Sequence, residues 1–142
     1  MSLLGIDYGS KKIGLAKADG NLALPFSILE NQGQQSNLVH LKEICQQQNI
    51  TAIVVGVPLS LGNRHKEFEI RPKDFANQQM QTVLAFVDWL KNNFDLPIIL
   101  EDERLSTKMA QQLQKDLTKK NGDDAVAAML ILQNYLDRQK NN

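Results

Sequence analysis

Three separate segments of the chain carry acidic side chains that can take part in chemistry. Asp7 interrupts an apolar stretch, "LLGIDYGSKKIGLA", that otherwise resembles β-strands, in which aspartate is depleted. Acidic residues also occur in "EDER" at 101–104 and as the pair Asp123 and Asp124 before an apolar helical pattern. If the three segments converge, carboxylates within about 4 Å repel by roughly 4 kcal/mol per pair at an effective dielectric of about 20. Such a cluster requires a cation or shared protons.

The scarcity of sulfur and imidazole groups restricts which cation the cluster can hold. Cys45 is the only cysteine, and His40 and His65 are the only histidines, which excludes a cysteine-based metal site. Carboxylate oxygens favour Mg²⁺ or Mn²⁺. A pair of these ions can hold the attacking water and the leaving oxygen of a phosphodiester. Phosphodiester hydrolysis is therefore one interpretation of the acidic segments.

Each acid also has a structural interpretation that involves no chemistry. Asp7 is suited to forming the turn that follows it, and Asp123 or Asp124 is suited to capping the next helix. Glu101 and its acidic neighbours can pair with Arg104 or end a strand in solvent. The residues alone leave both interpretations open.

Hydrophobic periodicity predicts the elements that position these acids. Apolar runs predict five strands, at 3–8, 12–18 and 22–29, within 51–59, and at 96–103. Helical spacing predicts four helices: one capped by Ser36 or Asn37, one from Pro72 to Asn93, one from Ser106, and one from Asp123 or Asp124. This order predicts an α/β fold whose mixed sheet, with its first three strands antiparallel, has helices on both faces. The charged stretch 60–74 is either a solvated loop or a substrate-facing flap.

Length and composition bound the remaining possibilities. A chain of 142 residues predicts one domain over 1–142. Sixteen basic and sixteen acidic residues balance, so net charge identifies no partner. Neither a signal peptide nor an apolar run of membrane-spanning length is present, which predicts a cytoplasmic protein with no membrane partner. Cys45 lies on the apolar stripe of the first predicted helix and is expected to be buried.

Four motifs together resemble the YqgF family of pre-16S rRNA nucleases and Holliday junction resolvase-like proteins, which has a ribonuclease H-like fold. They are "GIDYGSKKIGLA", "IVVGVPL", "DERLST" and "DDAVAAMLILQNYL", in the family's order. The resemblance covers nearly the whole chain and implies one five-stranded mixed sheet with the first strand central. It also implies that Asp7, Glu103 and Asp124 are the catalytic, metal-binding acids and hold one or two Mg²⁺ or Mn²⁺ ions.

With this resemblance, several basic residues become candidates for binding substrate phosphates. An arginine guanidinium has the fork geometry for a phosphate, and a basic loop beside an acidic site can hold a phosphate backbone. Lysines of the first hairpin have the alternative role of keeping a surface soluble. The candidates are Lys11, Lys12, Arg104, Lys119 and Lys120.

The expected function is metal-dependent hydrolysis of phosphodiester bonds in nucleic acid, in processing the 5′ end of pre-16S rRNA during ribosome biogenesis. The first alternative is resolution of Holliday junctions in branched DNA, which calls for a symmetric homodimer because two strands are nicked in matching positions. The second is a non-catalytic RNA- or ribosome-binding module used in ribosome assembly. A two-lobed ATPase of the actin and sugar-kinase type begins with a similar Asp-x-Gly hairpin, but 142 residues supply only one lobe.

Overall fold

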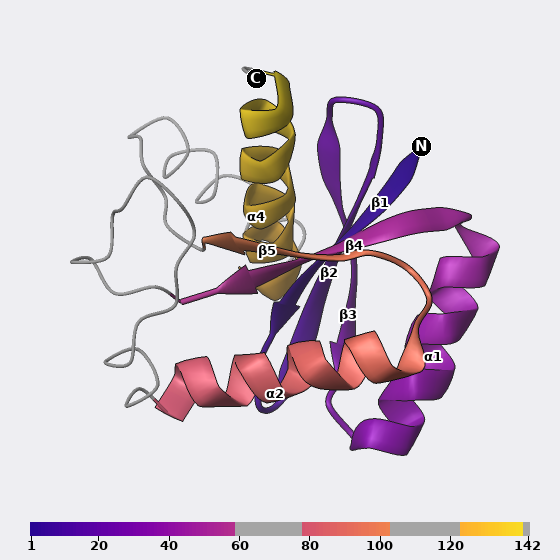
Figure 1. Ribbon diagram of the computed structural model, residues 1–142, viewed down its shortest axis with the longest axis vertical. Coiled ribbons are helices and arrows are strands. Elements are labelled where there is room, and N and C mark those ends of the chain that lie inside the picture. Colours follow the sequence, from indigo (N-terminus) through magenta and orange to yellow (C-terminus); the bar gives the residue numbers. More distant parts are fainter. Residues whose placement is uncertain (59–77, 103–122, 141–142) are drawn as a thin grey trace.

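The computed structural model describes residues 1–58, 78–102 and 123–140 (Figure 1). Within these ranges the elements are β1 (Ser2–Tyr8), β2 (Lys12–Asp19), β3 (Ala23–Glu30), α1 (Gln34–Gln47), β4 (Ile50–Val57), α2 (Gln78–Asn93), β5 (Ile98–Asp102) and α4 (Asp123–Lys140). The five strands agree with the predicted ones to within two residues at every end. The predicted helix from Ser106, the predicted helical residues before Gln78 and the stretch 60–74 lie outside the described residues.

The five strands form one mixed sheet in the order β3-β2-β1-β4-β5. β1 pairs antiparallel with β2, and β2 antiparallel with β3, whereas β1, β4 and β5 run parallel. The prediction of a mixed sheet with its first three strands antiparallel and its first strand central is therefore confirmed. The parallel strands all finish at one edge, called here the carboxyl edge. Asp7 lies one residue before the end of β1 at this edge.

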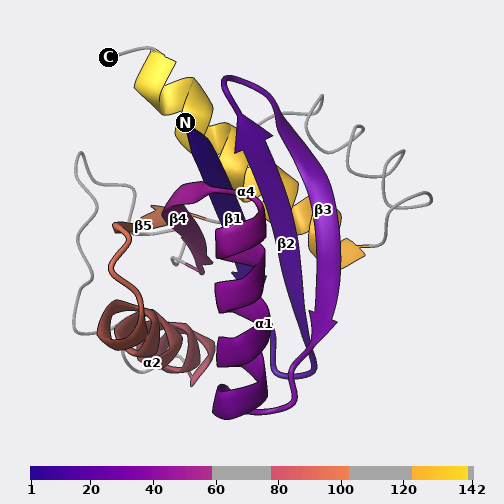
Figure 2. The ribbon, with the colours of Figure 1, turned by 90° about the vertical axis from the view of Figure 1, so that its right-hand side faces the viewer.

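Helices cover both faces of the sheet, as predicted: α1 and α2 lie on one face and α4 on the other (Figures 1 and 2). The face under α1 and α2 presents large aliphatic side chains, including Leu4, Ile6, Ile13, Leu15, Ile53, Val55 and Val57. Cys45 of α1 is buried among them, which confirms its predicted environment. The α4 face instead presents small residues, including Gly5, Gly14, Ala16, Ala18 and Ala52.

The small residues allow α4 to lie almost directly on the backbone of β1 and β2. A Cβ atom added at Gly5 would lie 2.9 Å from the Cβ of Leu132 and 3.0 Å from the carbonyl oxygen of Ala128. At Gly14 the added Cβ would lie 1.9 Å from the carbonyl oxygen of Asp124. Only glycine fits at this second position, and the first turn of α4 is therefore fixed against β2 by backbone contact.

Helix α1 begins earlier than its capping residues predicted. Its first residue is Gln34, and Gly33, with φ 104°, occupies the N-cap position without any side-chain cap. Ser36 and Asn37 lie inside the helix, so the prediction that one of them caps it is wrong. Glycine adopts this positive φ without strain, and Asn37 is buried with its side chain bonded to Asn31 rather than to the helix end.

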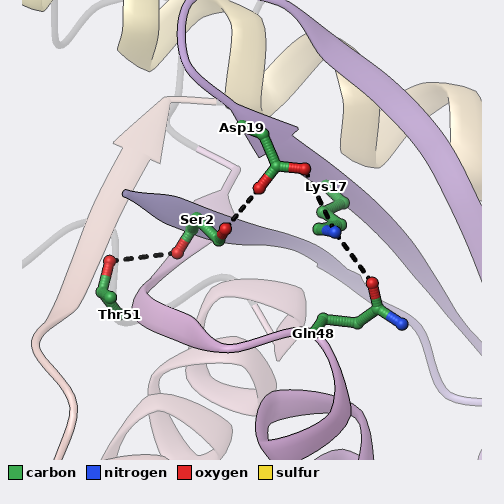
Figure 3. A network of polar contacts seen from close by, with 5 residues as sticks. All are labelled: Ser2, Lys17, Asp19, Gln48 and Thr51. Carbon is green, nitrogen blue, oxygen red and sulfur yellow. Dashed lines mark hydrogen bonds and ion pairs between the residues drawn. The ribbon is translucent and has the colours of Figure 1, made fainter.

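A network of polar contacts fixes the edge of the sheet opposite the carboxyl edge (Figure 3). The carboxylate of Asp19 accepts a hydrogen bond from Ser2 and pairs with the ammonium of Lys17 at 3.1 Å. Lys17 also donates to Gln48 at 2.8 Å, and Thr51 donates to the carbonyl oxygen of Ser2 at 3.1 Å. The bond from Ser2, followed by that from Lys17, holds the pKa of Asp19 below its usual value. The network joins β1, β2 and the start of β4.

The outer strand β3 is irregular in its middle. Pro25 pairs with Ala16 and Ser27 pairs with Leu15, which leaves Phe26 without a partner where the register shifts. Leu24 and Phe26 are exposed on this strand. Proline and a bulge are two features by which natural proteins interrupt a free sheet edge.

Candidate functional site

The Asp7 side chain faces the side of the sheet that α4 covers. Side chains alternate between the two faces along a strand. Leu3, four residues earlier, belongs to the hydrophobic cluster around α4, and Gly5, two residues earlier, lies against α4 itself. Asp7 pairs with Gly14 on β2, and paired residues have Cβ positions on the same face. The carboxylate, half-buried, therefore points to the face on which Gly14 touches α4.

Asp124 comes to this place from the other end of the chain. It lies in the first turn of α4, and its own Cβ is 3.0 Å from the position that a Cβ of Gly14 would take. Paired Cβ positions in antiparallel strands are about 5 Å apart, so the Cβ atoms of Asp7 and Asp124 lie within about 8 Å of each other. That separation lets two aspartate side chains share one ion with ligand distances of about 2.1 Å.

Glycine lies on both sides of Asp7 in the sheet. Gly14 is its partner on β2, and the parallel register that pairs Ile6 with Val55 places Gly56 beside it on β4. Gly56 is on the α4 side because Val54, two residues earlier, packs in the α4 cluster. No side chain from either neighbouring strand therefore stands beside the Asp7 carboxylate. On the β2 side, the backbone of Asp124 lies where a side chain of Gly14 would be.

Glu101 continues the same row of residues but is already engaged. It pairs with Gly56 on the far side of β4, two strands and thus about 10 Å from Asp7. It is buried and accepts a hydrogen bond from Arg138 of α4 in an ion pair. Burial raises the pKa of Glu101 despite the arginine. The expectation that Glu101 ends its strand in solvent is wrong, because the side chain is buried. Arg104, the other expected partner, lies outside the described residues.

The remaining predicted site residues are divided between the described and undescribed parts of the chain. Lys11 and Lys12 are exposed, in the turn after β1 and at the start of β2. Lys12 is two residues before Gly14, so alternation directs it to the α4 side. The residues outside the described ranges are Glu103, Arg104, Lys119 and Lys120.

The structure thus brings Asp7 and Asp124 together at the carboxyl edge, with Lys12 on the same face. Within 1–58, 78–102 and 123–140 no group of three or more metal-ligating side chains occurs, and the third predicted ligand lies outside these ranges. Two hard carboxylate oxygens beside glycine backbone fit Mg²⁺ or Mn²⁺ and not a soft metal. The two carboxylates are close enough to bind one divalent ion together.

Sequence reasoning missed Asn31, which follows β3 and contacts the turn after Asp7. No motif or periodicity distinguishes this asparagine from the other polar residues around it. Its contacts become visible only when the end of β3 is placed beside the end of β1. In the part of the chain that is described, no helix combines the length and apolar character needed to cross a membrane.

Comparison with known proteins identifies relatives along the full chain. The model of the RuvX family, described as Holliday junction resolvase, matches residues 1–138. A Thermoanaerobacter pseudethanolicus protein, provisionally named a pre-16S rRNA nuclease, is 35% identical over 149 residues, covering 99% of both chains. A Rickettsia bellii protein with the same provisional name is 34% identical over 142 residues, covering 95% of this chain and 85% of its own.

Solved structures with the same fold are much more distant in sequence. Thermus thermophilus RuvC in complex with a Holliday junction is 13% identical with a TM-score of 0.56, covering 99% of this chain and 96% of its own. The fowlpox virus resolvase bound to Holliday junction DNA is 12% identical with a TM-score of 0.55, covering 98% and 99%. At these identities the likeness establishes the fold, which is that of the resolvases, and nothing about the site.

Proposed function

The chain belongs to the RuvX family, described as Holliday junction resolvase, and from this premise we propose that it is a metal-dependent nuclease that hydrolyses phosphodiester bonds. The observation that carries the proposal is the contact of the first turn of α4 with Gly14. This contact brings Asp124 next to Asp7 at the carboxyl edge. Open α/β sheets characteristically bind ligands at this edge.

In this proposal, Asp7, Glu103 and Asp124 hold one or two Mg²⁺ or Mn²⁺ ions. When bound, the ions supply Lewis-acid stabilisation of the charge that develops on the phosphate. Asp124 belongs to a helix whose first turn is fixed to β2, so its position requires little reorganisation when the ion binds. Lys11 and Lys12, with Arg104, Lys119 and Lys120, attract and orient the substrate phosphates.

The substrate we propose is the 5′ end of pre-16S rRNA, because both close relatives bear that provisional name over nearly their full length. The protein then acts in the cytoplasm during ribosome assembly. Branched DNA is the second candidate, because the family description and both distant structures name Holliday junctions. Junction cutting requires two matched nicks and hence a symmetric dimer.

The test compares cleavage of a 5′-extended 16S rRNA precursor with cleavage of a four-way DNA junction, in Mg²⁺ and in Mn²⁺. Asp7→Asn and Asp124→Asn should each lower the rate by at least about 100-fold, because they remove metal ligands. Asp19→Asn is the matched control, since it removes an exposed carboxylate at the opposite edge of the sheet.

The two substrates separate the candidate functions. Cleavage of RNA alone supports rRNA maturation, whereas cleavage of the junction alone, by a protein that sediments as a dimer, assigns the activity to recombination. If the wild type cuts neither substrate above the Asp7→Asn background, the hydrolase proposal fails. RNA binding without cleavage would then favour the non-catalytic module.

A further inference from the structure

The turn between β1 and β2 is fixed by one side chain that the proposed mechanism does not use. The carboxamide of Asn31 donates to the carbonyl oxygen of Gly9 at 2.9 Å and to the hydroxyl of Tyr8 at 3.1 Å. The backbone N–H of Asn31 donates to the carbonyl oxygen of Lys11 at 2.9 Å. A single residue therefore contacts three of the four residues that follow Asp7 in the chain, Tyr8, Gly9 and Lys11.

Asn31 is itself held from behind by α1. Its side-chain oxygen accepts a hydrogen bond of 2.9 Å from the amide of Asn37, which is 3% exposed. Because donor and acceptor atoms of the Asn31 carboxamide are both used, the orientation of the group is fixed. The Tyr8 ring stacks on Phe86 of α2, with ring centroids 4.0 Å apart. The turn is thus joined to β3, α1 and α2 together.

The turn has little freedom of its own to take another shape. A Cβ atom at Gly9 would lie 2.6 Å from the carbonyl oxygen of Lys12, so the backbone closes tightly at this point. Lys11 and Lys12 extend from the turn into solvent. A fixed backbone presents these ammonium groups from constant positions, which lowers the ordering cost of a phosphate contact.

We propose that Asn31 is a positioning residue for substrate binding: it holds the turn of residues 9–11 so that Lys12, which follows the turn on the face of Asp7, contacts a substrate phosphate beside Asp7. This inference rests on the proposed nuclease function. Asn31 reaches the carbonyl oxygens of Gly9 and Lys11 and the Tyr8 hydroxyl, all on the side of the turn away from α4. It acts through the turn and not on the reacting atoms.

The test uses Asn31→Ala, Lys12→Ala and the double variant. Fluorescein-labelled precursor RNA is the probe in an anisotropy titration, and KM and kcat are measured on the same RNA. Asn31→Ala should raise Kd and KM by about tenfold, the size expected for one lost contact. It should leave kcat within about twofold. The double variant should bind no more weakly than Lys12→Ala, because the two residues act on one contact.

A salt series provides a readout that a merely structural role would not change. Each lost phosphate contact reduces the slope of log K against log salt by about one, and both Asn31→Ala and Lys12→Ala should show this reduction. Asn93→Ala is the matched control, because Asn93 also donates to a backbone carbonyl oxygen, that of Trp89, but at the end of α2. It should bind and cut as the wild type does.

Tyr8→Phe is a second variant that tests the same contact if Asn31→Ala does not fold. It removes only the hydroxyl that Asn31 contacts and keeps the stacked ring. It should raise Kd by a smaller factor, about threefold. Additive effects of Asn31→Ala and Lys12→Ala, or an unchanged salt slope, overturn the inference, while wild-type cleavage leaves the proposed function standing. Absence of wild-type RNA binding overturns the inference alone if the wild type cuts the DNA junction, and overturns both if it cuts neither substrate.

Discussion

Removal of Arg138 should destabilise the protein in a way that depends on pH. Glu101 is 4% exposed and is paired with Arg138, so Arg138→Met leaves a buried carboxylate without its cation. Breaking a fully buried pair costs about 3–5 kcal/mol. The Arg138 side chain is 58% exposed, so part of its charge is screened by water, and we expect about 2 kcal/mol at pH 7.

The pH dependence follows from the pKa of Glu101, which burial already raises above its usual value. Without Arg138, which lowers it, this pKa rises further. Above the new pKa the carboxylate is charged and the full penalty applies, whereas below it the neutral acid needs no cation. The stability difference from the wild type should therefore be largest near pH 7–8 and shrink as the pH falls through that pKa.

Thermal unfolding followed by circular dichroism between pH 5 and 8 measures this difference. A loss of about 2 kcal/mol corresponds to a Tm lowered by roughly 4–8 °C at pH 7 for a chain of this size. Lys140→Met is the matched control, since it removes a charge from the same last helical turn. In a Glu101→Gln background, Arg138→Met should cost much less. A Tm penalty independent of pH, or equal to that of Lys140→Met, would refute the reasoning.

Three further predictions concern stability and reactivity. Gly14→Ala should lower the free energy of unfolding, measured by urea denaturation, by at least about 3 kcal/mol, because its Cβ would meet the Asp124 carbonyl oxygen at 1.9 Å. Gly20→Ala is the control: its Cβ would meet open space, so only the positive φ should lower the free energy of unfolding, by roughly 1 kcal/mol. Burial raises the pKa of Cys45 to about 11, so an aromatic disulfide reagent at pH 8 should label the thiol only after unfolding, and rapid labelling of the native protein would contradict the burial. Asp19 has a lowered pKa, so its contribution to stability is present above its unfolded pKa and is lost as the pH falls through the folded value. Asp19→Asn should accordingly be less stable than the wild type at pH 6 and equal to it at pH 2, and a constant difference across this range would argue against the Ser2 and Lys17 contacts.

The strands could be predicted because alternation and apolar runs depend only on neighbouring residues. The start of α1 could not, since Ser36 and Asn37 are favourable caps in isolation and only the path from Asn31 through Gly33 shows where the helix begins. The ion pair of Glu101 with Arg138 could not be predicted either. The arginine is 37 residues away on α4, and no short-range pattern encodes such a contact.

The sequence allowed two residues of the candidate site to be predicted, but not the contact that brings them together. Asp7 and Asp124 were each recognisable from their motifs, and the predicted roles of both remain predictions. What brings them together is Gly14, which in the sequence is an ordinary glycine within a strand. Gly14 matters because it has no side chain, so the backbone of α4 can contact it directly. A missing side chain produces no hydrophobic or charge pattern in the sequence from which this contact could be predicted.

The irregular middle of β3 bears on how copies of this protein meet one another at high concentration. A regular outer strand offers a row of free N–H and C=O groups that a second sheet can extend, the first step of edge-to-edge aggregation. Pro25 lacks the N–H and the unpaired Phe26 breaks the row, so only short stretches on either side stay available. This irregular strand therefore disfavours continued edge-to-edge pairing of sheets from different copies. A symmetric dimer, if the protein forms one, is expected to use another surface.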